Sequence, residues 1–445
     1  MKKNSMTESA VELLVCRLAV PTIITMLITA LYNTADTYFI GKTDTNSTAS
    51  VGVAFSLMAV IQAIGFFFGH GSGNYMSRKM GEGNYKAAEI MGITGIVSSF
   101  ISGFVITILG LVFLKPLCSF MGSTDNMMET SVKYTAIILA AAPFMVTSFT
   151  MNNQLRFQGN AFLGMIGMTT GAVLNVILDP IFIFNFGMGI SGAALATAIS
   201  QVISFCILFK MRKIKISDLK KVKFSDEITT SIVNYGMPSL IRQGVGSVAS
   251  VCMNNVAGNY SEAVIAAVSV VNRITMIGNS VIIGFGQGFQ PVCGFNIGAK
   301  KYDRVIKAFK FCIKLSTVFM LVFGAIVYGF SPYLIEIFRD DPKVIEAGTV
   351  ILQFQCFTFI LQGVIIMTNM LLQNMGCTLR ASFLAITRQG LFFIPLVFVL
   401  SHFFGLLGLE MTQAIADTLS FLVTLPMTVV ALKDLNKMKL CRDSL

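Results

Sequence analysis

Twelve long apolar segments constrain this chain more than any other feature of its sequence. A helix of about twenty apolar residues crosses a bilayer, and each segment exceeds that length. Of the 445 residues, 54% are hydrophobic and 12% are charged, which is about half the charged fraction of a soluble domain. We therefore predict an all-α integral membrane protein with twelve transmembrane helices. The segments cover residues 15–41, 51–77, 90–114, 133–156, 162–186, 189–212, 230–257, 262–294, 307–335, 347–374, 382–404 and 406–432.

Lysine and arginine are distributed unevenly between the connecting loops. If the N-terminus is cytoplasmic, 26 of these 33 residues fall on the cytoplasmic side and five on the other, while Arg242 and Arg273 lie within segments. Cytoplasmic loops collect basic residues, so we expect both termini in the cytoplasm and the chain in the plasma (inner) membrane. The same bias explains the net charge of +11 without a nucleic-acid partner.

The two halves of the chain resemble each other at a constant offset of 217 residues. Between residues 21 and 85, eleven positions match without a gap, among them Pro21 with Pro238 and Tyr85 with Tyr302, and Asn152 matches Asn369 farther on. Such self-similarity indicates an internal repeat. We predict two pseudo-symmetric six-helix bundles, formed by residues 1–212 and 230–445 and joined by a basic cytoplasmic linker, 213–229.

A duplicated bundle pair is typical of alternating-access transporters. A channel usually assembles its pore from several identical subunits, and a receptor has no need of the duplication. The nine cysteines form no CxxC pair, and only two histidines are present, so we expect neither a disulfide framework nor a metal centre built on these residues. We expect a monomeric transporter in the lipid bilayer that is not an enzyme and requires no cofactor beyond a coupling ion.

Asp36 is the first of two acidic residues that stand out inside the apolar segments. Tyr32 lies four residues before it on the same helical face, and Asn33 lies beside them. An acidic residue within a span costs several kcal/mol and is by default a functional candidate. The alternative is that Asp36 lies near the outer end of its segment and is merely solvated.

Asp179 is the second, in the stretch LNVILDPIFIF. Asn175 lies one turn earlier and can donate its amide hydrogen to the carboxylate. Pro180 removes a backbone donor, which predicts a hinge; the alternative is an aspartate that caps a kink. A pair of carboxyl groups in one cavity could take up and release a proton near neutral pH.

The second half does not repeat these acids. At the same offset, Asp36 corresponds to Met253 and Asp179 to Leu396. We therefore assign ion coupling to the first half alone. Arg273 could bind a carboxylate or an anionic headgroup in a substrate cavity, or form a structural pair, whereas Arg242 could extend to the interface.

Four motifs resemble those of the multidrug and toxic compound extrusion (MATE) family, close to its DinF-like and MepA-like branch. They are YNTADTYFIG in the first segment, GNYMSRKMGEGNYKAAE after the second, NVILDPIFIF in the fifth and GISGAALATAISQ at the start of the sixth. The resemblance extends over nearly the whole chain. It implies a V-shaped pair of lobes that exports organic cations in exchange for protons or sodium.

The resemblance also implies roles for individual residues. The ion-coupling site, for a proton or a sodium ion, would consist of Asp36, Asn175, Asp179 and Thr197. Tyr134 and Asn152 would line the same cavity. The competing hypothesis is a flippase for lipid-linked oligosaccharides, although such a protein often has a basic cavity and the candidates in the first half are acidic.

Overall fold

The computed structural model describes residues 3–41, 45–124, 127–213 and 216–443, excluding the side chains of residues 3–5, 33, 37, 45–54, 216 and 443. All regular secondary structure within these ranges is helical. Every predicted segment is mostly helical, although 90–114 and 307–335 each run across a break between two helices. Eleven helices of the described part are long and apolar enough to cross a membrane. The exception is α9, the predicted seventh span, which carries Arg242 among Gly, Ser and Asn residues. The chain is thus an all-α, multi-pass membrane protein.

The contacts divide the chain into two compact units. Unit 1 comprises residues 1–5 and 24–240, and unit 2 comprises residues 6–23 and 241–445. The chain changes unit after Ser5, after Ile23 within α2 and after Leu240 within α9. The last two positions differ by the 217 residues of the sequence repeat. The division into residues 1–212, 213–229 and 230–445 stays a prediction.

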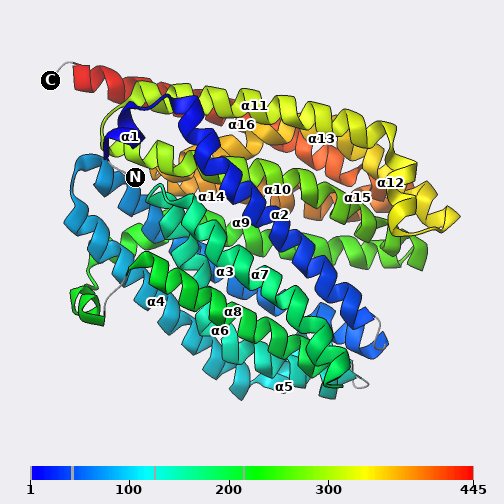
Figure 1. Cartoon of the computed structure of the whole chain (residues 1–445). Coiled ribbons are helices and arrows are strands. Elements are labelled where there is room, and N and C mark those ends of the chain that lie inside the picture. The colour runs from blue at the N-terminus through cyan, green and yellow to red at the C-terminus, as the bar shows by residue number, and fades with distance from the viewer. Residues whose placement is uncertain (1–2, 42–44, 125–126, 214–215, 444–445) are drawn as a thin grey trace. The chain divides into compact units, whose positions relative to one another are not determined.

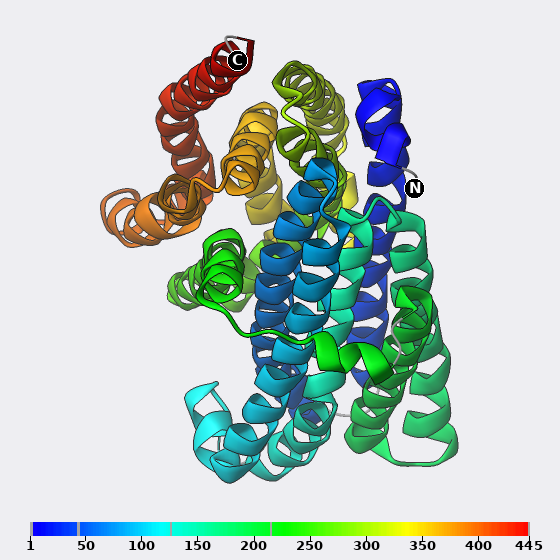
Figure 2. The same ribbon diagram turned by 90° about the vertical axis from the view of Figure 1, so that its left-hand side faces the viewer.

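Unit 1 is built around α6, which packs against α3, α4, α7 and α8. Glycines at every fourth position of α3 allow close approach: a Cβ atom on Gly65 or Gly69 would lie 2.6 or 2.7 Å from the Cβ of Phe149 or Asn153 on α6. In Figure 2, α3 and α4 run side by side. The helices of unit 1 are the first half of α1 (Lys3–Glu8), the second part of α2 (Val11–Gly41), α3 (Thr45–Glu82), α4 (Tyr85–Val112), α5 (Leu114–Phe120), α6 (Met128–Phe157), α7 (Ala161–Pro180), η2 (Ile181–Asn185), α8 (Gly189–Arg212), η3 (Ile216–Lys221) and the first part of α9 (Asp226–Gly258). The α-helices among them are labelled in Figure 1.

Unit 2 is built around α13, which is equivalent to α6 in the repeat and packs against α10, α11 and α16. Gly286 of α10 lies against Met370 of α13, just as Gly69 lies against Asn153 at the equivalent positions of unit 1. The helices of unit 2 are the second half of α1 (Lys3–Glu8), the first part of α2, the second part of α9, α10 (Glu262–Gly298), α11 (Tyr302–Gly329), α12 (Ser331–Phe338), α13 (Pro342–Met375), α14 (Thr378–Ile386), η4 (Thr387–Phe393), α15 (Ile394–Phe404) and α16 (Leu406–Asp443).

Residues 6–23 belong to unit 2, and their backbone accepts hydrogen bonds from side chains of that unit. Lys301 donates to the Thr7 carbonyl (3.0 Å) and Arg304 to the Ser9 carbonyl (2.6 Å). Farther along α2, a Cβ atom on Gly288 would come within 2.6 Å of the Ala19 Cα. The absence of a side chain on Gly288 therefore lets α2 lie directly on α10.

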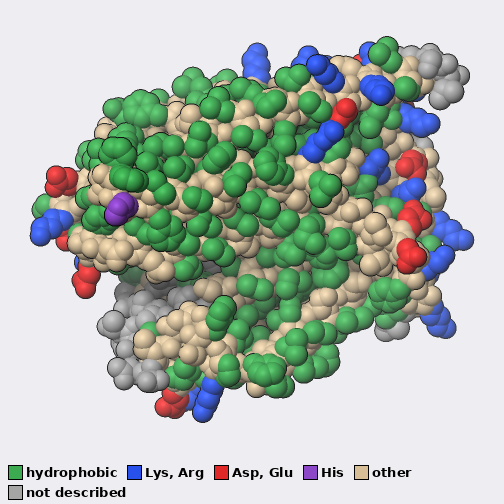
Figure 3. Space-filling view, turned by 180° about the vertical axis from the view of Figure 1, so that it is seen from behind, with side chains coloured by type: hydrophobic (Ala, Val, Ile, Leu, Met, Phe, Trp, Pro, Cys, Tyr) green, Lys and Arg blue, Asp and Glu red, His purple; other side chains and the backbone are tan. Residues whose placement is uncertain are grey.

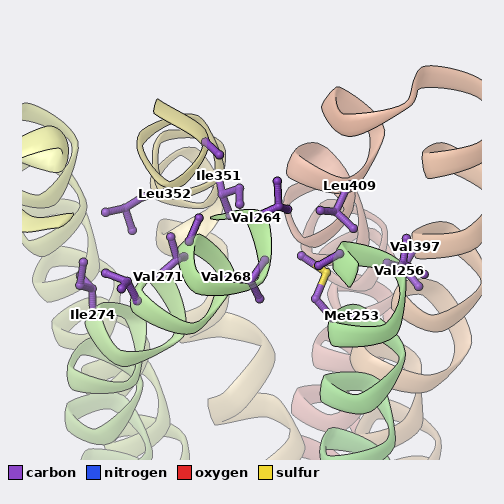
Figure 4. Close-up of a cluster of buried hydrophobic side chains, with 14 of the residues drawn as sticks. Met253, Val256, Val264, Val268, Val271, Ile274, Ile351, Leu352, Val397 and Leu409 are labelled. Atoms are coloured by element: carbon purple, nitrogen blue, oxygen red, sulfur yellow. The ribbon is translucent and has the colours of Figure 1, made fainter. Parts of the chain in front are cut away.

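The core of unit 2 is a cluster of buried aliphatic side chains. Figure 4 shows Val264, Val268 and Val271 of α10 facing Ile351 and Leu352 of α13. The outer faces of the helices are apolar too: Phe104 and Ile108 of α4 are about half exposed. In Figure 3, hydrophobic side chains cover the sides of the helices and charged side chains gather at their ends. An apolar outer surface of this extent is expected where lipid is the solvent.

Candidate functional site

Asp36 lies on the part of α2 that belongs to unit 1. Its side chain is only 2% exposed, and its Oδ1 atom has no hydrogen-bond partner in the described part of the chain. The structure therefore does not favour the alternative of a solvated aspartate at the end of its span. Tyr32, one turn earlier, is partly buried.

Asn175 and Asp179 occupy one buried face of α7. They are 2% and 0% exposed. The Asn175 Nδ2 atom donates to Asp179 Oδ1 (3.3 Å) and lies 3.2 Å from Thr197 Oγ1 on α8. The i, i+4 spacing thus pairs the amide with the acid as the sequence indicated, and the amide also connects α7 to α8.

Tyr134 completes the cluster from the central helix α6. Its side chain is fully buried, its hydroxyl group lies beside Thr197, and both Tyr134 and Tyr32 lie within electrostatic range of Asp36 and Asp179. The two carboxyl groups also interact electrostatically with each other. Helices α2, α6, α7 and α8 of unit 1 therefore bring these polar side chains together.

Four buried oxygen atoms of this cluster have no hydrogen-bond partner among the described residues. They are Asp36 Oδ1, Tyr134 Oη, Asn175 Oδ1 and Asp179 Oδ2, and other buried oxygen atoms of this kind occur in both units. No Lys or Arg of the described residues forms an ion pair with either carboxyl group. A buried polar atom without a partner costs about 1–3 kcal/mol. Carboxylate, amide and hydroxyl oxygens are acceptors that a proton or a hard cation would satisfy.

The backbone changes from α-helix to π-helix directly after Asp179 and Pro180. Helix α7 ends at Pro180 and continues as the π-helical turn η2. Proline cannot donate the backbone hydrogen bond and clashes with the preceding turn, and π-helical turns occur frequently at functional sites. The helix is therefore irregular at Pro180, as expected for a hinge. Motion at this position stays a prediction.

The remaining predicted residues lie elsewhere or cannot be placed. Asn152 of α6 packs against Gly164 of α7, where an added Cβ atom would overlap its Oδ1 atom. Arg273 is an exposed side chain of α10 and belongs to unit 2, and its role in a substrate cavity stays a prediction. The Asn33 side chain lies outside the described residues.

The sequence analysis placed both notable intramembrane acids in the first half, but α16 of the second half carries two more buried acids. Glu410 is 6% and Asp417 0% exposed, so that statement is wrong. Arg388 of η4 binds the Oδ1 atom of Asp417 (2.6 Å), Gln362 of α13 donates to Oδ2 (3.0 Å), and Gln413 donates to Oδ1 (2.8 Å). The missed signal was a carboxamide four residues before the acid, the spacing that identified Asn175 and Asp179.

Comparisons with known proteins agree with the fold and the repeat. The family model described as MatE matches residues 21–181 and 238–429, one match in each half. "Multidrug export protein MepA" of Staphylococcus saprophyticus is 28% identical over 421 residues, which cover 94% of this chain and 93% of that protein. The protein of the same name from Staphylococcus aureus (strain NCTC 8325 / PS 47) is 27% identical over 423 residues, with the same coverage. These names agree with the predicted branch.

Solved structures are similar over almost the entire chain. One, described as the outward-facing conformation of a multidrug resistance MATE family transporter of the MOP superfamily, superposes with a TM-score of 0.92 at 26% identity and covers 98% of this chain and 99% of its own. A second, described as MATE in the straight conformation, gives the same values.

Proposed function

This chain belongs to the MatE family of membrane transporters, whose relatives are export proteins and not enzymes, and we propose that it exports cationic, amphiphilic compounds by cation-coupled antiport. The buried, unpaired carboxyl groups of Asp36 and Asp179 carry this proposal. A transporter that exchanges cations needs a site whose charge changes when the coupling ion arrives, and a carboxyl group without a basic partner supplies it.

The coupling site in this proposal consists of Asp36, Asn175, Asp179 and Thr197. A proton or a sodium ion would bind the oxygen atoms that the protein leaves without partners, so the ion restores the missing interactions. The Tyr134 hydroxyl group lies close enough to respond to that change of charge. The ion is cargo, and the proposed mechanism involves no other cofactor.

The irregular backbone at Pro180 links ion binding to conformation. Asp179 precedes the proline directly, and the π-helical turn follows it. Ion binding at Asp36 and Asp179 would rearrange α2 and α7 around Pro180 and release the exported compound. Because linkage is reciprocal, the exported cation would in turn lower the affinity for the ion.

The remaining expectations belong to the same proposal. We place the protein in the plasma (inner) membrane with both termini in the cytoplasm, because the basic loop residues lie mainly on one side. We propose a monomer, since each half of the duplicated chain forms a compact unit of its own.

Proteoliposomes test the ion coupling directly. Purified protein would be reconstituted, and ethidium transport would be followed by fluorescence under an imposed pH gradient and, separately, an imposed sodium gradient. We expect transport with at least one gradient. Transport that ignored both gradients would contradict the antiport mechanism.

Single variants test the assignment of the site. We expect Asp36→Asn and Asp179→Asn to abolish gradient-driven transport, while the matched control Asp434→Asn, which alters an exposed carboxylate, retains it. Translocation of a lipid-linked oligosaccharide headgroup in place of ethidium would favour the flippase alternative.

A further inference from the structure

Unit 2 contains a cavity of about 270 Å³ between α9, α10, α13, α14 and η4. Its walls combine isoleucine, leucine and methionine side chains with two guanidinium groups and several carboxamides. Sites that enclose a whole small molecule typically measure 300–1,000 Å³. This cavity is slightly smaller, so it fits one end of an amphiphilic compound. The polar lining residues are Arg242, Gln243, Asn279, Asn369, Arg388 and Gln389.

The two arginines of the cavity differ in how their charge is balanced. Arg388 is paired with the buried carboxylate of Asp417, at 2.6 Å. Arg242 has no ion-pair partner in the described part of the chain; its one hydrogen bond is from Nη1 to Asn369 Oδ1 (2.9 Å). The cavity therefore carries one positive charge that the surrounding described side chains do not neutralise.

The Arg242 guanidinium is held in place by its neighbour. Asn369 donates its own amide hydrogen to the carbonyl of Ala381 on α14 (2.7 Å), which directs its oxygen atom toward Arg242. A guanidinium group has five N–H donors, so four remain after this bond. Asn279 adds a buried Oδ1 acceptor that has no partner within the described ranges.

The equivalent positions of unit 1 lack this charge. At the offset of 217, Arg242 corresponds to Thr25 and Arg388 to Gly171. Unit 1 instead holds the unpaired carboxyl groups, so the two units carry polar sites of opposite charge.

We propose that this cavity binds a carboxylate of the transported compound, with Arg242 as the residue that determines specificity for it. The inference rests on the proposed export function and adds a preference, among its cationic substrates, for amphiphiles that also carry an acidic group. A guanidinium binds a carboxylate through two parallel hydrogen bonds, and Asn279 can accept a hydrogen bond from a donor on the same compound.

A matched dye pair tests this proposal. Rhodamine B carries a free carboxylate, and its ethyl ester has the same cationic ring system without that charge. Binding of both dyes would be measured with the purified full-length protein in phosphatidylcholine nanodiscs, and transport of both in proteoliposomes. The variants are Arg242→Gln, Arg242→Lys and the control Arg380→Gln, which alters an exposed arginine of the same unit.

We expect wild type to bind the acid more tightly than the ester. In Arg242→Gln the affinity for the acid should fall by roughly tenfold to a hundredfold, the value of a charge-assisted hydrogen bond, while the affinity for the ester changes less than about twofold. Arg242→Lys keeps the charge but not the two parallel bonds, so it should retain part of the preference. Arg380→Gln should behave like wild type.

Other outcomes overturn the proposal. If Arg242→Gln weakens both dyes equally or neither, Arg242 does not recognise a carboxylate. If the variant keeps its preference for the acid but no longer retains phosphatidylglycerol on purification, the guanidinium binds a lipid phosphate instead. If wild type transports the ester under a gradient but shows no preference for the acid, this inference fails while the proposed export function stands. If it transports neither these dyes nor ethidium, the export function fails.

Discussion

Asp179 in unit 1 and Asp417 in unit 2 share the same local arrangement but have opposite surroundings. Both are fully buried, and both accept a hydrogen bond from a carboxamide four residues earlier on the chain, Asn175 or Gln413. Asp417 is further bound by Arg388 and Gln362, whereas the Oδ2 atom of Asp179 has no partner in the described structure.

The difference shows how one local motif can serve two purposes. A buried acid whose oxygen atoms are all bound belongs to a fixed network, and removing one partner is costly. A buried acid with a vacant oxygen atom can respond to an arriving ion. The number of tertiary partners, rather than the local sequence, therefore separates the structural acid from the candidate coupling acid.

Asp179→Asn should give the largest effect. Replacing the acid by an amide removes the group that we propose changes charge, so gradient-driven ethidium transport should fall to the level of protein-free liposomes. Stability should change by no more than about 1 kcal/mol, because the acid has no ion-pair partner to lose. Transport would be measured in proteoliposomes and stability by denaturant titration in detergent. If the variant transported ethidium at the wild-type rate, Asp179 would not be the coupling acid.

Asp417→Asn should mainly affect stability. The change leaves the Arg388 charge without its carboxylate, which typically costs about 3–5 kcal/mol in a buried pair. The double variant Asp417→Asn, Arg388→Gln should recover much of that loss, because no isolated charge remains. The same denaturant titration measures both, and equal stability of the single variant and wild type would show that the pair is dispensable.

Gly164→Ala should have an intermediate effect confined to unit 1. The added Cβ atom would overlap Asn152 Oδ1, and overpacking costs about 1–3 kcal/mol, more than the helix gains from alanine. The equivalent position of unit 2 is already Ala381, whose carbonyl accepts a hydrogen bond from Asn369. The reciprocal change Ala381→Gly should cost about 0.5–1 kcal/mol, and the two values would show how far the repeats have diverged.

Arg380→Gln should have the smallest effect. Arg380 pairs with Asp434 at 2.8 Å, but the two side chains are 47% and 37% exposed. Exposed ion pairs contribute about 0–1 kcal/mol, so the free energy of unfolding should hardly change. A loss as large as that of Asp417→Asn would mean that burial does not explain the importance of the Arg388 pair.

The sequence predicted the helices well because each depends on local information. The apolar segment 189–212 coincides with α8, and the offset of 217 also relates the two positions at which the chain changes unit. The pairing of Asn175 with Asp179 followed from helical spacing alone. The same spacing relates Gln413 to Asp417, so local information suffices to identify that pair as well.

Residues far apart in sequence were harder to assign. Thr197 and Tyr134 entered the site only through family resemblance, because helical periodicity carries no information about which faces of α6, α7 and α8 meet. The alternatives for Arg273, a cavity residue or a structural pair, stay predictions, and its side chain is exposed; Arg242 lines the cavity of unit 2. Both arginines lie within apolar segments, and nothing local distinguishes them.

The sequence by itself determined that this chain spans a membrane many times and that its halves repeat. It also determined that Asp36 and Asp179 lie within membrane spans, where an acidic side chain costs free energy and is a functional candidate. These properties follow from hydropathy and spacing along single helices. Only the tertiary structure decided which acid acquired an arginine and which kept a vacant oxygen atom. Hydrogen-bond partners come from neighbouring helices, and packing in three dimensions sets their distances.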